Sequence, residues 1–343
     1  MTTAVSNGVD GLFENDQYGN LKPSVAEDWS VSQDGLTYTY KIRKGLKWYT
    51  SDGEEYANVT AKDFVTGLKH AADTNSEAIY LLQNSVKGLN DYLSGANKDF
   101  SNVGIKAVDD YTLQYTLSQP EPYWNSKLTY SVTWPVNGDF LKSKGKDFGK
   151  STDPTSILYN GPYLLKALTT KSSIEFTKNE NYWDKDHVYF DNIKLTYDDG
   201  SDQESLERNF TDGVYNLARL FPTSSNYSKV EKQYKDNIFY TQPGSAVEGV
   251  GINIDRQTYG HTSKENDQQK TSTKTALLNK DFRQSLGFAI DRTNYAAQLN
   301  GKEGESTAVR NIFVKPDFVQ ADGKDFGTMV MDQLPSYGDE WSV

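Results

Sequence analysis

The sequence predicts a mixed α/β fold with more than one domain, and three observations support this class. Segments that alternate polar and apolar residues, as strands do, are interspersed with segments that have helical spacing. Asp-Gly pairs at 34–35 and 52–53 mark tight turns between the strand-like segments. The length of 343 residues exceeds the usual size of one domain and can bury a large core.

The first half of the chain predicts strands and a capped helix. Residues 36–43 alternate in polarity and are rich in β-branched and aromatic residues, so they predict a strand after the turn at 34–35. The segment from Thr60 to Asp63 resembles a capping box, with Asp in place of the usual Glu or Gln, and predicts the start of an amphipathic helix. Residues 79–82 predict further helix, and 111–117 predict a strand with one wet face.

The second half predicts the same mixture. Residues 174–179 and 193–197 predict strands, and 206–213 predict a helix. Residues 281–292 predict a helix with Asn279 as its N-cap. The apolar residues expected on one face of this helix are Phe282, Leu286, Ala289 and Ile290. The polar segment 255–274 predicts a surface loop.

Composition excludes several classes of function. A net charge of -11 with no basic stripe argues against nucleic acid as a partner. No apolar run approaches the ~18 residues that span a membrane. Cysteine is absent, so no disulfide, zinc thiolate site or thiol nucleophile forms. With 3 histidines and neither a G-x-S-x-G nor an H-E-x-x-H motif, the sequence predicts no catalytic or metal site and no cofactor.

A long string of turn and aromatic residues near the N-terminus resembles family 5 solute-binding proteins, the peptide-binding components of ABC importers. The matching positions are Gly11-Leu12, Pro23, Ala26, Trp29, 34–40, 43–45, Trp48, Asp52-Gly53, Thr60 and Asp63. Later segments that resemble motifs of the same family are 103–124, Asn160-Gly161-Pro162-Tyr163, Asn181-Tyr182-Trp183, Gly249 to Asn253 and 281–292. The resemblance is specific because the string is long, whereas no single part of it would be a specific signal.

The resemblance implies a bilobal α/β fold of the periplasmic-binding-protein type (class II), with an extra domain and an incomplete second lobe. Residues 1–9 and 151–246 would form lobe I, 10–150 the extra domain of peptide binders, and 247–343 a partial lobe II. Family members of this type begin with a signal peptide that ends in a lipidated cysteine and continue well past the last residue here. We therefore expect a chain truncated at both ends, with a shorter natural variant as the alternative.

The resemblance also implies a function. We expect a non-catalytic, monomeric protein that captures oligopeptides outside the cell for the permease subunits of an ABC transporter. Contact with the membrane would occur only through a lipid anchor that this chain lacks. One alternative is the same fold binding another solute, such as an oligosaccharide, haem or a peptide pheromone. A second alternative is a secreted glycosidase, which would need a carboxylate pair whose spacing in three dimensions sequence does not give.

Three segments are candidates for ligand binding. Asn160, Gly161 and Tyr163 form either a turn that feeds a strand or part of the ligand cleft at the lobe junction. A second group follows a predicted strand and consists of Arg219, Phe221 and Ser224. Its arginine either meets a ligand carboxylate in bidentate fashion or forms a surface ion pair.

The third candidate segment has small residues, which leave backbone N–H and C=O groups open. It consists of Gly244, Ser245, Ala246 and Val247. Such a segment suits a receptor that holds an extended peptide by its main chain, as in strand addition, and leaves the peptide side chains in wet pockets. The alternative is an ordinary loop before a strand.

Overall fold

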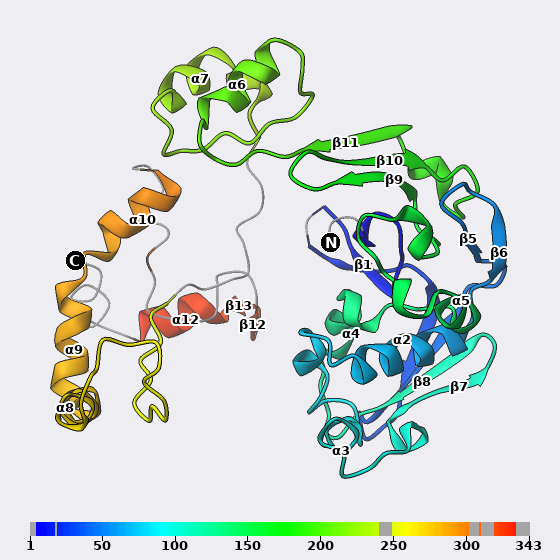
Figure 1. Cartoon of the computed structure of the whole chain (residues 1–343), viewed down its shortest axis with the longest axis horizontal. Coiled ribbons are helices and arrows are strands. Elements are labelled where there is room, and N and C mark those ends of the chain that lie inside the picture. Colours follow the sequence, from blue (N-terminus) through cyan, green and yellow to red (C-terminus); the bar gives the residue numbers. More distant parts are fainter. Residues whose placement is uncertain (1–4, 18, 240–248, 302–308, 310–318, 334–343) are drawn as a thin grey trace. The chain divides into compact units, whose positions relative to one another are not determined.

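The computed structural model describes residues 5–17, 19–239, 249–301, 309 and 319–333. The chain divides into two compact units, residues 1–198 and 199–343 (Figure 1). The helix that begins after Thr60 and the helix capped by Asn279 belong to different units. The finer division into lobe I, an extra domain and a partial lobe II stays a prediction.

A four-stranded antiparallel sheet forms the centre of the first unit, with strand order β3-β4-β8-β7. Its strands are β3 (Ala26–Val31), β4 (Thr37–Ile42), β7 (Ile105–Asp109) and β8 (Thr112–Thr116). The expected hairpin is confirmed, because Gly35 has a φ of 70° at the turn between β3 and β4. The alternation expected over 111–117 is present, because Leu113, Tyr115 and Leu117 are buried whereas Gln114 and Thr116 on the other face are half-buried. The Gln114 amide on this face donates to Thr39 Oγ1 at 3.1 Å.

Helix α2 (Ala61–Asp73) packs against β7 and β8 of this sheet (Figure 1). The capping box predicted from sequence is present, and the N–H of Thr60 donates to Asp63 Oδ2 at 2.8 Å. The helix buries the face that carries Phe64 and Leu68. Gly67 lies so close to the Trp134 carbonyl that an added Cβ would come within 2.1 Å of the oxygen, so this contact requires glycine.

Aromatic side chains fill the core between α2 and the sheet. Trp124, Tyr40 and Tyr115 are fully buried, and their rings meet edge to face or tilted. Tyr40 and Tyr115 centroids lie 6.3 Å apart, and Tyr115 and Trp124 centroids 5.2 Å apart. Such pairs add to the free energy gained from apolar burial. Aromatic residues make up 13% of the chain, and many of them therefore serve packing.

A three-stranded antiparallel sheet, in the order β11-β10-β9, forms a second layer of the first unit. Its strands are β9 (Tyr163–Thr169), β10 (Ser173–Lys178) and β11 (Asn192–Thr196), which confirms the two strands predicted in this region. A small core of Tyr49, Tyr159, Leu164, Leu165 and Phe176 lies against it, with Tyr163. Tyr49 and Tyr159 exchange backbone hydrogen bonds of 2.7 and 2.9 Å and so connect this layer to the N-terminal part of the unit.

The remaining elements of the first unit are short. They are β1 (Phe13–Asn15), β2 (Leu21–Pro23), β5 (Lys47–Tyr49), β6 (Glu55–Asn58), α3 (Leu89–Ser94), α4 (Trp124–Lys127) and α5 (Gly138–Lys144). The predicted turn at Asp52-Gly53 is confirmed between β5 and β6, where Gly53 has a φ of 81°. The helix expected at 79–82 is only a 3-10 turn, Ile79–Leu81.

The second unit is mainly helical in its described part. Its elements are α6 (Glu204–Thr211), α7 (Tyr227–Gln233), α8 (Asp267–Leu278), α9 (Lys280–Ala289), α10 (Arg292–Asn300), β12 (Gln320–Ala321), β13 (Lys324–Asp325) and α12 (Phe326–Asp332). The surface loop predicted for 255–274 is wrong from residue 267 onward, where α8 begins. Its N-cap is Asn266, whose side chain accepts from the Gln269 N–H at 3.0 Å.

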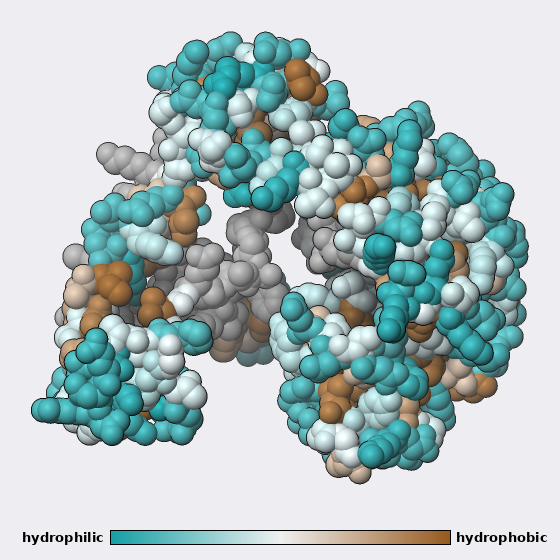
Figure 2. Space-filling view, in the orientation of Figure 1, coloured by the Kyte–Doolittle hydropathy of each residue, from teal (hydrophilic) through white to brown (hydrophobic). Residues whose placement is uncertain are grey.

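The helix predicted over 281–292 is divided at its C-terminal end. Asn279 caps α9 as expected, because its Oδ1 accepts from the Phe282 N–H at 3.1 Å. The helix ends at Ala289, and Asp291 then caps α10. Phe282 is 41% exposed and Leu286 is 38% exposed. Figure 2 shows apolar residues beside polar ones in the region of α9 and α10. Among the described helices, none has both the length and the apolar character needed to cross a bilayer.

Candidate functional site

Asn160 and Gly161 join the start of β9 to the N-terminal segment of the chain. The Asn160 side chain binds both backbone groups of Asp10: its Oδ1 accepts from the Asp10 N–H at 2.9 Å, and its Nδ2 donates to the Asp10 carbonyl at 3.3 Å. The N–H groups of Asn160 and Gly161 both donate to the Gly8 carbonyl, at 3.2 and 3.0 Å. Asn160 is 5% exposed, and both polar groups of its side-chain amide bond the backbone of Asp10. The residue therefore holds residues 8–10 in place.

Gly161 is required by close backbone contact. A Cβ at this position would lie 2.8 Å from the carbonyl carbon of Gly8 and 2.9 Å from the Val9 nitrogen. Tyr163 continues the pairing, since its N–H donates to the Asn7 carbonyl at 3.0 Å. Its ring is 8% exposed and packs against Phe176. The structure therefore brings these three predicted residues together as a clamp on the N-terminal segment, and direct ligand contact stays a prediction.

Sequence reasoning missed three residues that complete this clamp. Asn179 Nδ2 donates to the Gly161 carbonyl at 3.0 Å, and the Tyr182 hydroxyl donates to Asp10 Oδ2 at 2.8 Å. Burial raises the pKa of Asp10 to about 7, against hydrogen bonding from Tyr182 that lowers it. One sequence signal was available, namely an acidic residue at position 10 between the apolar residues Val9 and Leu12.

The second group of predicted residues lies together in the second unit. The Arg219 guanidinium lies 4.6 Å from the Phe221 ring centroid, which is a cation–π contact. The Ser224 N–H donates to the Phe221 carbonyl at 3.0 Å, and its hydroxyl contacts Asn226. Arg219 is exposed and forms no ion pair with any described residue. The structure has no strand between the end of β11 and Arg219. The expectation that this group directly follows a strand is therefore wrong.

The third group, Gly244, Ser245, Ala246 and Val247, lies outside the described residues.

Two hollows in the described part of the chain bear on the candidate residues. A groove of about 640 Å³ in the first unit lies beside the Asp52-Gly53 turn and the β9–β10 hairpin, and Asn179 of the clamp contributes to its lining. Its charged lining residues are of both signs: Asp52, Lys166, Lys178 and Glu180.

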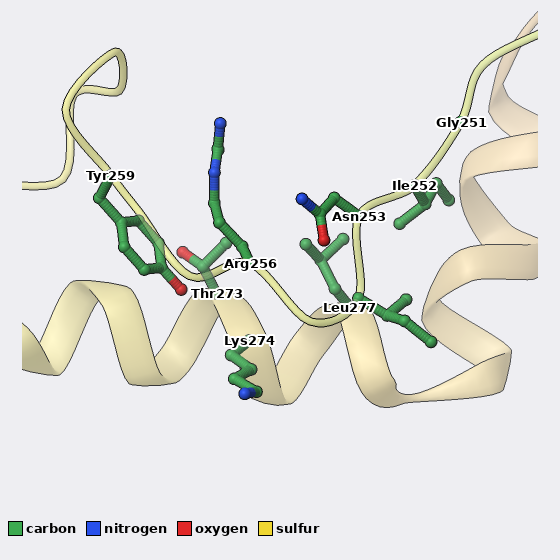
Figure 3. A pocket seen from close by; sticks show the side chains of 9 residues that line it. Gly251, Ile252, Asn253, Arg256, Tyr259, Thr273, Lys274 and Leu277 are labelled. Carbon is green, nitrogen blue, oxygen red and sulfur yellow. The ribbon is translucent and has the colours of Figure 1, made fainter. Parts of the chain in front are cut away.

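An open pocket of about 340 Å³ lies in the second unit, between residues 251–259 and α8. Figure 3 shows Thr273 and Leu277 directed from the helix toward the loop, while Arg256 extends away from the helix. Arg256 lies 5.6 Å from the Tyr259 ring centroid, and Lys274 pairs with Asp255 at 3.0 Å. The lining holds no carboxylate or imidazole that could act as a general base.

The described residues contain no group of three or more His, Asp or Glu side chains that could hold a metal ion. His187 is exposed and bonds Asp184 at 2.6 Å, and this contact raises its pKa. The pKa of His70 is lowered by burial, and its ring meets Phe148 edge to face. The Thr74 hydroxyl donates to the backbone carbonyl of His70 at 2.7 Å, and among the described residues no serine or threonine hydroxyl bonds either of these two imidazole rings, as the base of a nucleophilic site would require.

Comparison with protein families matches residues 20–325 to bacterial extracellular solute-binding proteins, family 5. The chain belongs to this family. Family 5 membership agrees with the resemblance seen in the sequence, and its members are extracellular or periplasmic. The expected α/β fold of this class is confirmed by solved structures of similar proteins.

Relatives of this family 5 protein include several from streptococci. It is 71% identical over 340 residues to the oligopeptide-binding protein AmiA of Streptococcus pneumoniae, covering 99% of this chain and 52% of the relative. It is 62% identical to the oligopeptide-binding protein SarA of Streptococcus gordonii, covering 99% of this chain and 51% of the relative. The chain spans about half the length of the curated relatives that it matches.

Two solved structures cover most of the family 5 chain. Peptide-bound OppA of Listeria monocytogenes matches with a TM-score of 0.69 and 28% identity, over 94% of this chain and 58% of that one. The peptide-binding pheromone receptor PrgZ matches with a TM-score of 0.71 and 25% identity, over 95% of this chain and 59% of that one.

Proposed function

We propose that this protein captures oligopeptides outside the cell and delivers them to the permease of an ABC importer, without catalysis. The observation that carries the proposal is the 71% identity over 340 residues to an oligopeptide-binding protein. In this proposal the protein acts as a monomer at the cell surface. Since this chain has no cysteine, a lipid anchor would have to be attached outside it.

The two groups of described residues would have different roles. Asn160, Gly161 and Tyr163 would position one wall of the site, because their polar groups already hold residues 7–10. Arg219 and Phe221 would contact the ligand, since the guanidinium lies on the ring with no carboxylate partner among the described residues. A guanidinium in this state suits a peptide carboxylate or a backbone carbonyl.

A second candidate is a receptor for a peptide pheromone. The observation that favours it is the similarity to PrgZ, whose solved structure is described as a peptide-binding pheromone receptor. Both candidates bind an extended peptide through its main chain, and they differ in how strongly the side chains of the peptide are selected.

Calorimetry with a mixed pool of oligopeptides tests the proposal. The chain itself and the complete reading frame that contains it would both be measured, with oligosaccharides and haem as comparison ligands. We expect peptide binding in the micromolar range or tighter for the complete protein and weaker binding for this chain. Each wall alone supplies only a few hydrogen bonds of about 0.5–1.5 kcal/mol. If no peptide binds the complete protein, the peptide assignment is wrong.

A matched pair of variants tests the ligand contact. Arg219→Ala should weaken peptide binding by about 1.5–3 kcal/mol, the value of a hydrogen bond to a charged group. Arg208→Ala is the control, because Arg208 lies on the exposed surface of α6 and pairs with Asp202 at 2.5 Å. Equal losses of peptide-binding free energy in both variants would show that Arg219 makes no specific contact with the ligand.

A further inference from the structure

Strand β11 bonds a neighbouring strand on only one side within the described residues. It is the outer strand of the β11-β10-β9 sheet, and Figure 1 shows it at the edge of that sheet. At its two ends, the Lys178 N–H donates to the Asp191 carbonyl and the Tyr197 N–H donates to the Ser172 carbonyl, both at 2.8 Å. Residues bonded in this way alternate with unbonded ones in an antiparallel pair. The backbone groups of the odd-numbered residues from 191 to 197 therefore face β10.

The even-numbered residues of β11 consequently direct their N–H and C=O groups away from the sheet. They are Asn192, Lys194 and Thr196, and all three are exposed. No described strand pairs with this side of β11. A row of open backbone donors and acceptors is a template onto which another strand can add.

The apolar face of the same sheet is also uncovered beside β11. Across the β10–β11 pair, Phe176 lies opposite Ile193 and Ile174 lies opposite Leu195. Phe176 is buried, whereas Leu195 is 39% exposed. Tyr197 follows Leu195 on the same face by the alternation of an extended chain, and it is 52% exposed. A strand added beside β11 would cover these two side chains.

Nothing in β11 blocks the addition of a strand. An edge strand is often protected by a charged side chain or a proline. The one charged residue of β11 is Lys194, and its ammonium pairs with Glu175 of β10 at 3.1 Å, across the sheet and away from the open edge. The strand contains no proline. The open edge of β11 therefore has the features of a surface that is covered in the working protein.

The relatives contain chain that could cover this edge. The similarity to AmiA spans 99% of this chain but 52% of the relative, so about half of the relative lies outside the matched region. A ligand that binds and leaves would expose the edge in the unliganded protein, where it would promote aggregation. A segment of the same polypeptide would cover the edge at all times.

We propose that the open edge of β11 is the docking site for an extended segment of the complete protein, outside these 343 residues, which adds to the three-stranded sheet as a further strand. The segment would bond the backbone groups of Asn192, Lys194 and Thr196 and place alternate apolar side chains against Leu195 and Tyr197. This role does not depend on the identity of the ligand.

Hydrogen exchange tests the proposal by comparing this chain with the complete protein, both without peptide. The outward amides of Lys194 and Thr196 should exchange at least about tenfold more slowly in the complete protein than in this chain. The amides of Ile193 and Leu195, which face β10, are the internal control and should be protected in both.

Three results of this experiment would overturn the proposal. The first is fast exchange of the outward amides in the complete protein. The second is protection that appears only when peptide is added, which would make the ligand the occupant. The third is protection already present in this chain and lost on dilution, which would make a second copy of the chain the occupant.

A matched pair of variants tests the contribution of one outward N–H. Lys194→Pro removes that donor, which edge strands tolerate, and Lys194→Ala controls for the loss of the pair with Glu175. In the complete protein, Lys194→Pro should lower the folding constant about tenfold more than Lys194→Ala, beyond any difference between the two in this chain. The same difference in both proteins would contradict the proposal.

A cross-link identifies the segment. This chain contains no cysteine, so a photo-reactive group can be attached at Thr196→Cys alone within it. In the complete protein we expect the cross-linked peptide to come from outside these 343 residues. A cross-link found only to residues of this chain would show that the docking segment lies within it, and the proposal would be wrong.

Discussion

The indole N–H of Trp48 donates a hydrogen bond of 3.0 Å to the carboxylate of Asp63 inside the core of the first unit. The same carboxylate oxygen accepts from the Thr60 N–H at 2.8 Å and completes the capping box of α2. Asp63 is 5% exposed and Trp48 is 2% exposed. Asp63, whose side chain is shorter than that of Glu, thus both caps the helix and accepts the hydrogen bond of a buried indole. This double role gives a physical reason for Asp where capping boxes usually have Glu or Gln.

Asp63→Ala should lower the free energy of unfolding by about 2–4 kcal/mol, because it removes a helix cap and leaves a buried donor unsatisfied. Urea denaturation measures the change. Lys62→Ala is the control at the adjacent position, where an exposed pair with Asp110 contributes at most about 1 kcal/mol. A loss no larger than that of the control would show that the Trp48 bond contributes nothing to stability.

Lys127→Ala should destabilise the first unit by about 3–5 kcal/mol, since it leaves the buried Glu121 carboxylate without its cation. Lys127 Nζ lies 2.8 Å from Glu121 Oε2 and 2.6 Å from Ser85 Oγ. The double variant Lys127→Met with Glu121→Gln should recover much of the loss. Thermal unfolding of the wild type, Lys127→Ala and the double variant tests this prediction. Lys69→Ala is the control, because Lys69 forms an exposed ion pair with Asp73.

Gly161→Ala should cost about 1–3 kcal/mol, because the new methyl group would collide with the backbone of Gly8 and Val9. Those backbone atoms cannot move without breaking the hydrogen bonds to Asn160. Gly251→Ala is the matched control, since nothing lies within 4 Å of its added Cβ. Amide exchange should show the loss concentrated at residues 160–163. Protection unchanged there would mean that the N-terminal segment shifts freely.

His70 should make the free energy of unfolding fall on the acid side. Burial lowers its pKa from 6.5 in the folded chain, so the unfolded chain binds the proton first as pH falls. Stability is then fully present above about pH 6.5 and is lost as the pH falls toward the folded pKa. His70→Gln should remove this loss in unfolding measured against pH. Persistence of the acid-side slope in the variant would assign it to other groups.

Local patterns predicted local structure well. The alternation of polar and apolar residues and the Asp-Gly pair were enough to predict β4 and the turn at Gly35. The segment from Thr60 to Asp63 was enough to predict the start of α2. Each of these depends on residues within a few positions of one another. Helix α8 was missed because its sequence is polar and lacks apolar periodicity, although Asn266 offered a cap signal.

By itself the sequence determined the family, the α/β class and several elements of the first unit, namely β4, β8, β10, β11 and the start of α2. These follow from short-range spacing and from a long motif string. Only the tertiary structure decided what the candidate residues do. It placed the Asn160 amide on the backbone of Asp10, 150 positions away, and the Tyr182 hydroxyl on its carboxyl, 172 positions away. Burial and hydrogen-bond partners over such separations come from packing of the whole chain, which no local pattern encodes.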